Sequence, residues 1–383
     1  MNSIYLDNAA TSFPKPPGVA LAMARYINEI GSPLNRSTYG AAADAADAAL
    51  QLRTALKALF HFPYDETHVI ITPGATIGLN MAIKGYVKPG DHVLVSAMEH
   101  NAVMRPLMQL ACSGVMLDRI PADAQGILLP ETIAPLVRPN TTLLVVTHAS
   151  NVSGGINPIE KVARIARQFG IPLVLDAAQS AGHIPIDFGA LTLAAMAVPA
   201  HKGLLGPGGI GALLLAPVFA AKLTPLIAGG TGSASDSEEL PPYMPDRFEC
   251  GTLNIPGIFG FLHAIEYMAQ HGRKIWAHET LCTRRFLEGV AGIPGVRLMG
   301  PPGLEGRVGV ISLDFIYQDN ADVAETLDTR YGILTRCGLH CAPNAHKTLH
   351  TFPKGTVRFS IGPFTTLADI DAAIAAIQAI AKG

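Results

Sequence analysis

Six short apolar runs recur between residues 69 and 215, and this alternation constrains the fold more than any other feature of the sequence. Segments with helical patterns separate the runs, and strands that are apolar on both faces are typical of parallel sheets covered by helices on each side. We therefore expect an α/β fold. The runs are VIIT (69–72), HVLVS (92–96), LLVVTH (143–148), PLVLD (172–176), AMAV (195–198) and GALLL (211–215).

The clearest helix between these runs is IEKVARIARQF, residues 159–169. One face, at the 3.6-residue period of a helix, is expected to hold Ile159, Val162, Ala163, Ala166 and Phe169. Asn157 is predicted to cap its first turn, and Gly170 is predicted to end it in the left-handed conformation.

The pattern changes after about residue 257, where long helices replace the alternation. We interpret this part as a smaller α+β domain, joined by the N-terminal segment. The predicted large domain covers residues 15–256, and the small one covers 1–14 and 257–383. The elements expected after 257 are helices at about 257–270, 276–290, 321–330 and 367–381, and strands near 308–315, 333–336 and 357–360.

Composition excludes several classes of protein. The 28 Lys and Arg residues against 30 Asp and Glu give a net charge of −2, with no basic run, so nucleic acid is not an expected partner. The apolar run at 210–221 falls short of the roughly 20 residues that a bilayer requires. The N-terminal residues lack the features of a signal peptide, and the five cysteines show no C-x-x-C spacing typical of zinc sites. We expect a cytoplasmic protein with no metal and no membrane partner.

Three weaker signals follow one another along the chain. Gly74, Ala75 and Thr76 follow a strand and open a helix, so their N–H groups can hold a phosphate, although a plain turn has the same pattern. Asp176 ends an apolar strand, either as a helix cap or as the partner of a protonated ring nitrogen. Lys202 precedes a glycine-rich turn and is either a surface residue or a Schiff-base amine. In this order the three are what pyridoxal phosphate requires.

Further motifs, in one order over nearly the whole chain, carry a resemblance to a known family. The chain resembles class V aminotransferase-fold enzymes of the cysteine desulfurase and selenocysteine lyase family, in their short-loop branch. The resemblance implies the fold of type I PLP-dependent transferases, with a mainly parallel seven-stranded sheet in the large domain and a small α+β domain. The motifs are YLDNAATS (5–12), GATIGLN (74–80), MEHNA (98–102), THASNVSGGINPI (147–159), VLDAAQS (174–180), AHKGLLGPGGIG (200–211), FECGTLN (248–254), RCGLHCAP (336–343) and VRFSIGPFTT (357–366).

The same resemblance implies pyridoxal 5′-phosphate as the cofactor. Lys202 would bind it as a Schiff base, Asp176 would pair with the ring nitrogen, and His100 would stack on the ring. Pro199 departs from the family pattern, since a residue with a hydroxyl usually stands three positions before the lysine and contacts the phosphate. The other implied cofactor contacts are Gln179, Asn151, Ala75, Thr76, His201 and, across the interface of an obligate homodimer, Thr252.

The resemblance also implies the substrate pocket. Arg358 would bind the α-carboxylate, unless it is a strand-end arginine with an acidic neighbour, and Arg336 and Asn35 are weaker candidates. Cys341 aligns with the cysteine that attacks the substrate sulfur, and His340 and Arg336 are expected to help ionise it. Cys337 is interpreted as a structural thiol, with a second sulfur-carrying position as the alternative.

The function expected from these residues is conversion of L-cysteine to L-alanine, which leaves a persulfide on Cys341 for a protein sulfur acceptor. Selenocysteine lyase, another amino-acid β-lyase or an epimerase are alternatives on the same fold, and in these Cys341 is incidental. A third possibility is a scaffold without activity. Retention of Lys202, Asp176, His100 and Arg358 argues against it, since a scaffold has no physical need for all four.

Overall fold

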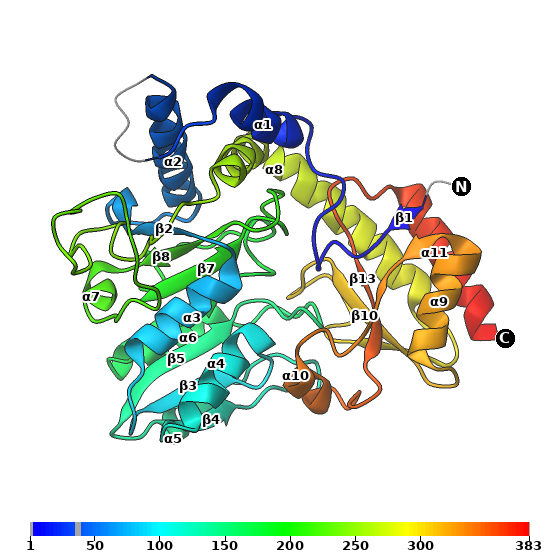
Figure 1. Cartoon of the computed structure of the whole chain (residues 1–383). Helices are drawn as coiled ribbons and strands as arrows, with labels where there is room; N and C mark the ends of the chain where they lie inside the picture. The colour runs from blue at the N-terminus through cyan, green and yellow to red at the C-terminus, as the bar shows by residue number, and fades with distance from the viewer. Residues whose placement is uncertain (1–2, 35–39, 383) are drawn as a thin grey trace.

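The computed structural model describes residues 3–34 and 40–382, and its centre is a seven-stranded sheet (Figure 1). The strand order is β2-β8-β7-β6-β5-β3-β4. β8 runs antiparallel to β2 and β7, and the other neighbours are parallel. The expected mainly parallel sheet is therefore confirmed. Its strands are β2 (Val69–Thr72), β3 (His92–Ser96), β4 (Met116–Ile120), β5 (Thr141–Thr147), β6 (Leu173–Asp176), β7 (Ala195–Pro199) and β8 (Gly211–Leu215).

All seven strands except β4 coincide with the apolar runs of the sequence. β4 lies at one edge of the sheet, and its sequence MLDRI contains two charged residues and buries fully only Ile120. Most side chains of β4 stay partly or fully exposed, so this strand carries no apolar run that would reveal it, whereas β2 at the other edge is buried throughout.

Helices surround the sheet and connect its strands. The N-cap of α6 is Pro158 and not Asn157, because the side chain of Asn157 is buried and bonded elsewhere: its Oδ1 accepts from the N–H of Leu128 and its Nδ2 donates to the carbonyl of Thr147. The capping role predicted for Asn157 is wrong, whereas Gly170 has the predicted positive φ of 66°. The helices up to residue 220 are α1 (Val19–Arg25), η1 (Tyr26–Ile30), α2 (Gly40–Leu59), η2 (Glu66–His68), α3 (Ala75–Tyr86), α4 (Asn101–Ala111), η3 (Pro130–Thr132), α5 (Ile133–Leu136), α6 (Ile159–Gln168) and α7 (Pro217–Ala220).

A second, antiparallel sheet with strand order β12-β13-β10-β9 follows in the C-terminal part. The N-terminal segment returns to this part, since β1 pairs with β11 and Asp7 forms a bridge with Ser360. The elements are β1 (Ile4–Tyr5), β9 (Val296–Met299), β10 (Val310–Phe315), β11 (Ile333–Leu334), β12 (Arg336–Gly338), β13 (Thr356–Ser360), α9 (Asn320–Tyr331), α10 (Pro343–Thr348) and α11 (Leu367–Lys382).

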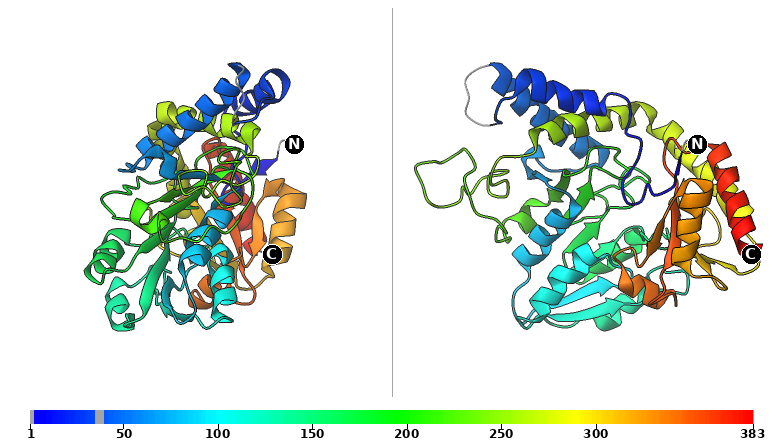
Figure 2. Two further views of the ribbon diagram at one scale, coloured as in Figure 1. Left: turned by 60° about the vertical axis from the view of Figure 1, so that its left-hand side comes forward. Right: turned by 45° about the vertical axis from the view of Figure 1, so that its right-hand side comes forward.

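One long helix, α8 (Ile255–Val290), replaces the two helices expected at 257–270 and 276–290 (Figure 2). Its first half packs into the core around the large sheet through Phe261, and its second half packs into a separate core through Phe286. Residues 271–276 contain no proline, so nothing interrupts the backbone hydrogen bonds between the halves. The proposed domain boundary at 256/257 stays a prediction. No described helix combines the length and hydropathy that a bilayer crossing requires.

Candidate cofactor and substrate site

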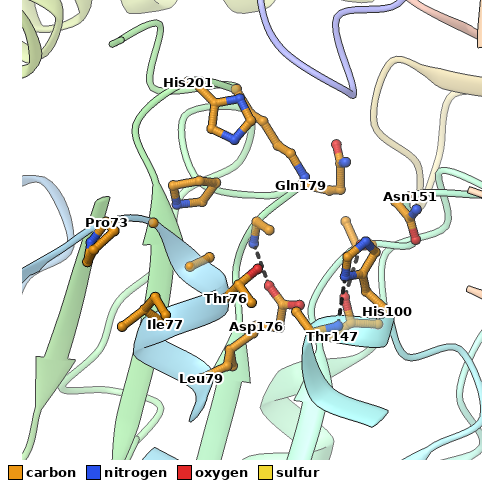
Figure 3. Close-up of a pocket in the computed structure, with 17 residues that line it drawn as sticks. Pro73, Thr76, Ile77, Leu79, His100, Thr147, Asn151, Asp176, Gln179 and His201 are labelled. Atoms are coloured by element: carbon orange, nitrogen blue, oxygen red, sulfur yellow. Dashed lines mark hydrogen bonds between the residues drawn. The ribbon is translucent and has the colours of Figure 1, made fainter. Parts of the chain in front are cut away.

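A cavity of about 180 Å³ lies at the carboxyl ends of β5, β6 and β7, where parallel α/β sheets bind their ligands (Figure 3). The N-terminal turns of α3 and α4 and the loops after the three strands form its walls. The expected cofactor residues, apart from Thr252, meet here although they are far apart in the sequence. Those that line the cavity are Ala75, Thr76, His100, Asn151, Asp176, Gln179, His201 and Lys202.

Asp176 is the buried carboxylate of this cavity. Its Oδ1 accepts a hydrogen bond from the N–H of Ala178 at 2.9 Å, and no other described residue donates to the carboxylate. Burial raises the pKa of Asp176, while the same hydrogen bond and the charge of Lys202 favour its ionised form. Asp176 therefore caps the following turn and keeps one oxygen for a further donor.

Lys202 is the amine of the cavity. Burial lowers its pKa to about 8, Asp176 opposes that shift, and the charges of Arg358 and Arg336 assist it. A substantial fraction of the amine is therefore neutral and nucleophilic near pH 8.

His100 presents an uncharged imidazole. It caps α4, with Nδ1 accepting the N–H of Ala102 at 3.0 Å, so the ring proton lies on Nε2. Burial, followed by the charges of Lys202, Arg358 and Arg105, lowers the pKa of His100 to about 4. A flat, neutral ring beside the cavity is suited to stacking.

The N-terminus of α3 is an open set of donors. Gly74 occupies the N-cap position with a φ of 147°, and no side chain caps the helix. A Cβ on Gly211 would lie 2.9 Å from the Cα of Gly74, so glycine at 211 permits this close approach. The first N–H groups of α3 are thus available to an anion. Pro199 lines the cavity and, as expected, supplies no hydroxyl there.

Gln179 and Asn151 are both buried and both donate to backbone carbonyls. Gln179 Nε2 donates to Ala9 at 2.9 Å, and Asn151 Nδ2 donates to His340 at 2.6 Å. These bonds fix the orientation of the two amides at the cavity wall. Burial and the neighbouring lysines lower the pKa of His201 to about 4, so this ring is also neutral.

An acidic residue that the sequence analysis did not select joins the two candidate arginines. Asp7 Oδ1 lies 2.8 Å from Nη2 of Arg358, and its Oδ2 lies 3.1 Å from Nε of Arg336. The arginines are direct partners across β13 and β12, so Asp7 offsets their repulsion. Arg358 is 3 % exposed, and its Nε has no partner among the described residues. Asp7 lies within the YLDNAATS motif, which is the sequence feature that could have identified it. Asn35, the third candidate for this pocket, lies outside the described residues.

Cys341 is exposed at the end of a short loop beside the cavity. Its carbonyl accepts the N–H of Asn101 at 2.7 Å, and a charge on its sulfur favours the protonated forms of Lys202 and Arg358. The help in ionisation expected from His340 is not supported, because burial lowers the pKa of this histidine to about 2 and leaves it uncharged.

Cys337 is half-buried on β12, and burial raises the pKa of its thiol. The charges that act on it are those of Asp319 and Lys354, whereas its chain neighbour Arg336 lies beside Asp7. The two side chains thus have different surroundings, as alternation along a strand requires.

Glu99 is a second buried acid that the sequence analysis missed. It is fully buried; Oε1 accepts the N–H of Thr147 at 2.6 Å and the hydroxyl of Ser96, while Oε2 has no partner among the described residues. Burial raises its pKa to about 8, and the charge of Asp176 adds to that effect. Glu99 belongs to the motif MEHNA, from which only His100 was taken as a candidate site residue.

Thr252 is not brought to the cavity. It is exposed and lines a second hollow with Arg53 and Glu249, which form a buried ion pair at 2.7 Å. The interpretation that Thr252 serves a partner subunit stays a prediction.

Residues 4–373 match the family model described as aminotransferase class V. A probable cysteine desulfurase from Methanothermobacter thermautotrophicus is 34 % identical over 96 % of this chain and 92 % of its own length. A cysteine desulfurase from Escherichia coli O127:H6 is 32 % identical over 98 % of this chain and 93 % of its own length.

Solved structures agree with these relatives. The apo structure of a cysteine desulfurase from Thermococcus onnurineus NA1 superposes with a TM-score of 0.92 at 30 % identity, covering 100 % of this chain and 95 % of that one. Both the sequence match and the architecture extend over nearly the whole chain. This protein belongs to the class V aminotransferase family.

Proposed function

We propose that this chain is a pyridoxal-phosphate-dependent cysteine desulfurase, which converts L-cysteine to L-alanine and keeps the sulfur atom as a persulfide on Cys341. The observation that carries the proposal is the position of Cys341, whose loop is bonded to Asn101, the neighbour of His100 at the cavity. An exposed thiol beside a cavity with a buried carboxylate and a buried amine has the groups that this reaction needs. The names of the similar proteins support the same activity.

The residues present fit pyridoxal phosphate. The free oxygen of Asp176 suits a protonated ring nitrogen, the first N–H groups of α3 suit a phosphate, and Lys202 suits the aldehyde carbon. Gln179, Asn151 and His201 would complete the contacts within the subunit. When bound, the cofactor supplies an electron sink for the electron pair left on the substrate carbon.

The chain's own side chains bind and orient the amino acid. Arg358 is the proposed carboxylate ligand, since its buried Nε still lacks an acceptor. Arg336 extends the same positive surface and is half exposed. With a pKa of about 8, Lys202 can accept the proton that leaves the substrate Cα.

Cys341 carries out the sulfur transfer. Its thiolate forms a bond to the substrate sulfur while the bond between that sulfur and Cβ breaks. The electron pair of the broken bond stays with the carbon fragment, which takes up protons and leaves as L-alanine. The sulfur remains on Cys341, so the step consumes no external oxidant or reductant.

Substitution of Cys341 distinguishes this function from its alternatives. Cys341→Ser should abolish persulfide and almost all alanine formation from L-cysteine, whereas Cys337→Ser should retain both. Loss of cysteine turnover with retained turnover of selenocysteine would favour selenium or dual specificity, because selenium is the better leaving group. Full alanine formation from L-cysteine by Cys341→Ser would refute the persulfide step and favour a β-lyase or an epimerase.

The remaining proposals concern partners. A persulfide must be passed on, so a protein thiol is the proposed sulfur acceptor. A homodimer is proposed from the role that the family resemblance implies for Thr252, at the phosphate of a partner subunit, and the exposed position of Thr252 is compatible with it. A cytoplasmic location stays a prediction. A purified protein that took up no pyridoxal phosphate would support the scaffold alternative, and its visible absorption measures this directly.

A further inference from the structure

The backbone at the proposed nucleophile has an unusual conformation. His340 has a φ of 49° and Cys341 has a φ of 56°. Two consecutive residues other than glycine therefore occupy the left-handed region, which side chains disfavour. Such a conformation persists where the surrounding contacts hold it, and it is concentrated at functional sites.

Backbone contacts to the cavity hold part of this loop. Asn151 Nδ2 donates to the carbonyl of His340 at 2.6 Å, and the N–H of Asn101 donates to the carbonyl of Cys341 at 2.7 Å. Both donors belong to segments that form the cavity wall (Figure 3). The loop that carries Cys341 is thus attached to the walls of the cavity.

The side chain of His340 attaches the loop on its other side. The residue is 7 % exposed, and its Nε2 lies 3.1 Å from Oγ1 of Thr356 on β13. Its ring also packs against that of His346, with 5.5 Å between the ring centroids. A buried, uncharged ring between β13 and α10 can resist movement of the loop but cannot supply charge to the thiol.

We infer that His340 is a positioning residue, which holds Cys341 in the left-handed conformation beside the cavity and takes no part in proton transfer. This role rests on the proposed function for its effect on sulfur transfer, but the attachment of the loop is measurable without any reaction.

The test compares His340→Ala with His350→Ala in the full chain loaded with pyridoxal phosphate. His350 is a matched control, because it also has a positive φ, of 56°, but is exposed. We expect His340→Ala to lower kcat for alanine formation about 100-fold, as misplacement of a reacting group does, with KM for L-cysteine nearly unchanged because Arg358 is intact. The control should retain kcat.

Two further measurements separate positioning from ionisation. The pH midpoint of Cys341 alkylation should be the same in wild type and His340→Ala, since the buried ring carries no charge that its removal would take from the thiol. The amide of Asn101 should exchange its hydrogen faster in His340→Ala and not in the control, because its acceptor is the Cys341 carbonyl. Thr356→Val removes only the hydroxyl beside Nε2 of His340. It should likewise speed hydrogen exchange at the Asn101 amide and lower kcat.

Several results would overturn the inference. A higher alkylation midpoint in His340→Ala, with kcat recovered at high pH, would make His340 an ionising partner. Unchanged exchange at Asn101 in both His340→Ala and Thr356→Val would show that the loop needs no such attachment, and if His340→Ala does not fold, Thr356→Val alone decides. Absence of persulfide in the wild type would refute the proposed function, while the exchange measurement still tests the attachment.

Discussion

Asp7 and Arg358 form a buried ion pair, with 2.8 Å between Oδ1 and Nη2, although 351 positions separate them in the chain. Asp7 belongs to the segment that follows β1, and Arg358 belongs to β13. Because Asp7 also contacts Arg336, one carboxylate compensates two neighbouring guanidinium groups. The pair therefore joins the N-terminal segment, which packs against β13, to the proposed substrate site.

Asp7→Ala should destabilise the protein strongly. It leaves the buried guanidinium of Arg358 without its counter-charge, and removal of one partner of a buried pair costs about 3 kcal/mol or more in the free energy of unfolding. Asp371→Ala is the matched control, because its ion pair with Arg285 at 2.7 Å is exposed and should contribute less than about 1 kcal/mol. Urea denaturation measures both. Equal losses in the two variants would show that Asp7 has no special role.

Glu99→Gln should change the pH dependence of stability. In the folded protein the pKa of Glu99 is raised from 4.5 to about 8, so the unfolded chain releases this proton first as pH rises. The contribution of Glu99 to stability is thus fully present below pH 4.5 and is lost as pH rises towards 8, by about 1.4 kcal/mol per pH unit at most.

Glutamine keeps an oxygen for Thr147 and cannot ionise, so the difference in unfolding free energy between Glu99→Gln and wild type should grow in favour of the variant as pH rises. Denaturant titrations of the apoprotein across this range measure it. A difference that stays constant with pH would mean that Glu99 does not titrate there.

Covalent uptake of pyridoxal phosphate by the apoprotein should depend on the protonation of Lys202. With a pKa of about 8, its amine becomes neutral as pH rises through that value, so the uptake rate should increase and then level off. Lys202→Ala should show no covalent label after borohydride reduction. Burial also lowers the pKa of Lys15 to about 8, so Lys15→Ala is a control that should remain labelled. Label retained in Lys202→Ala would identify another attachment site.

Thr252→Ala tests the shared site. Sedimentation of the wild type should give about twice the chain mass of 40.3 kDa. If Thr252 contacts the phosphate in a partner subunit, the variant should bind pyridoxal phosphate more weakly while its mass stays that of a dimer. Thr329→Ala, exposed on α9, should bind it normally. A fully active monomer would contradict the shared site.

Much of the architecture could be predicted from local sequence. Apolar runs with little polar interruption form strands where both faces of the sheet are buried, and β5, β6 and β7 are of this kind. Asp176 ends β6 and Lys202 follows β7, so these parallel strands bring the two residues to one edge of the sheet. The order of strands along the chain therefore predicts that Asp176 and Lys202 lie close together.

Tertiary structure decided what depends on distant neighbours. Asp7 became the partner of Arg358 only through the return of the N-terminal segment to β13, and the two halves of the continuous helix α8 are buried in two separate cores. The uncharged state of His340 likewise follows from burial beside Thr356. Periodicity and turn residues are local properties that the sequence itself carries, whereas burial and charge pairing arise only when remote segments pack together.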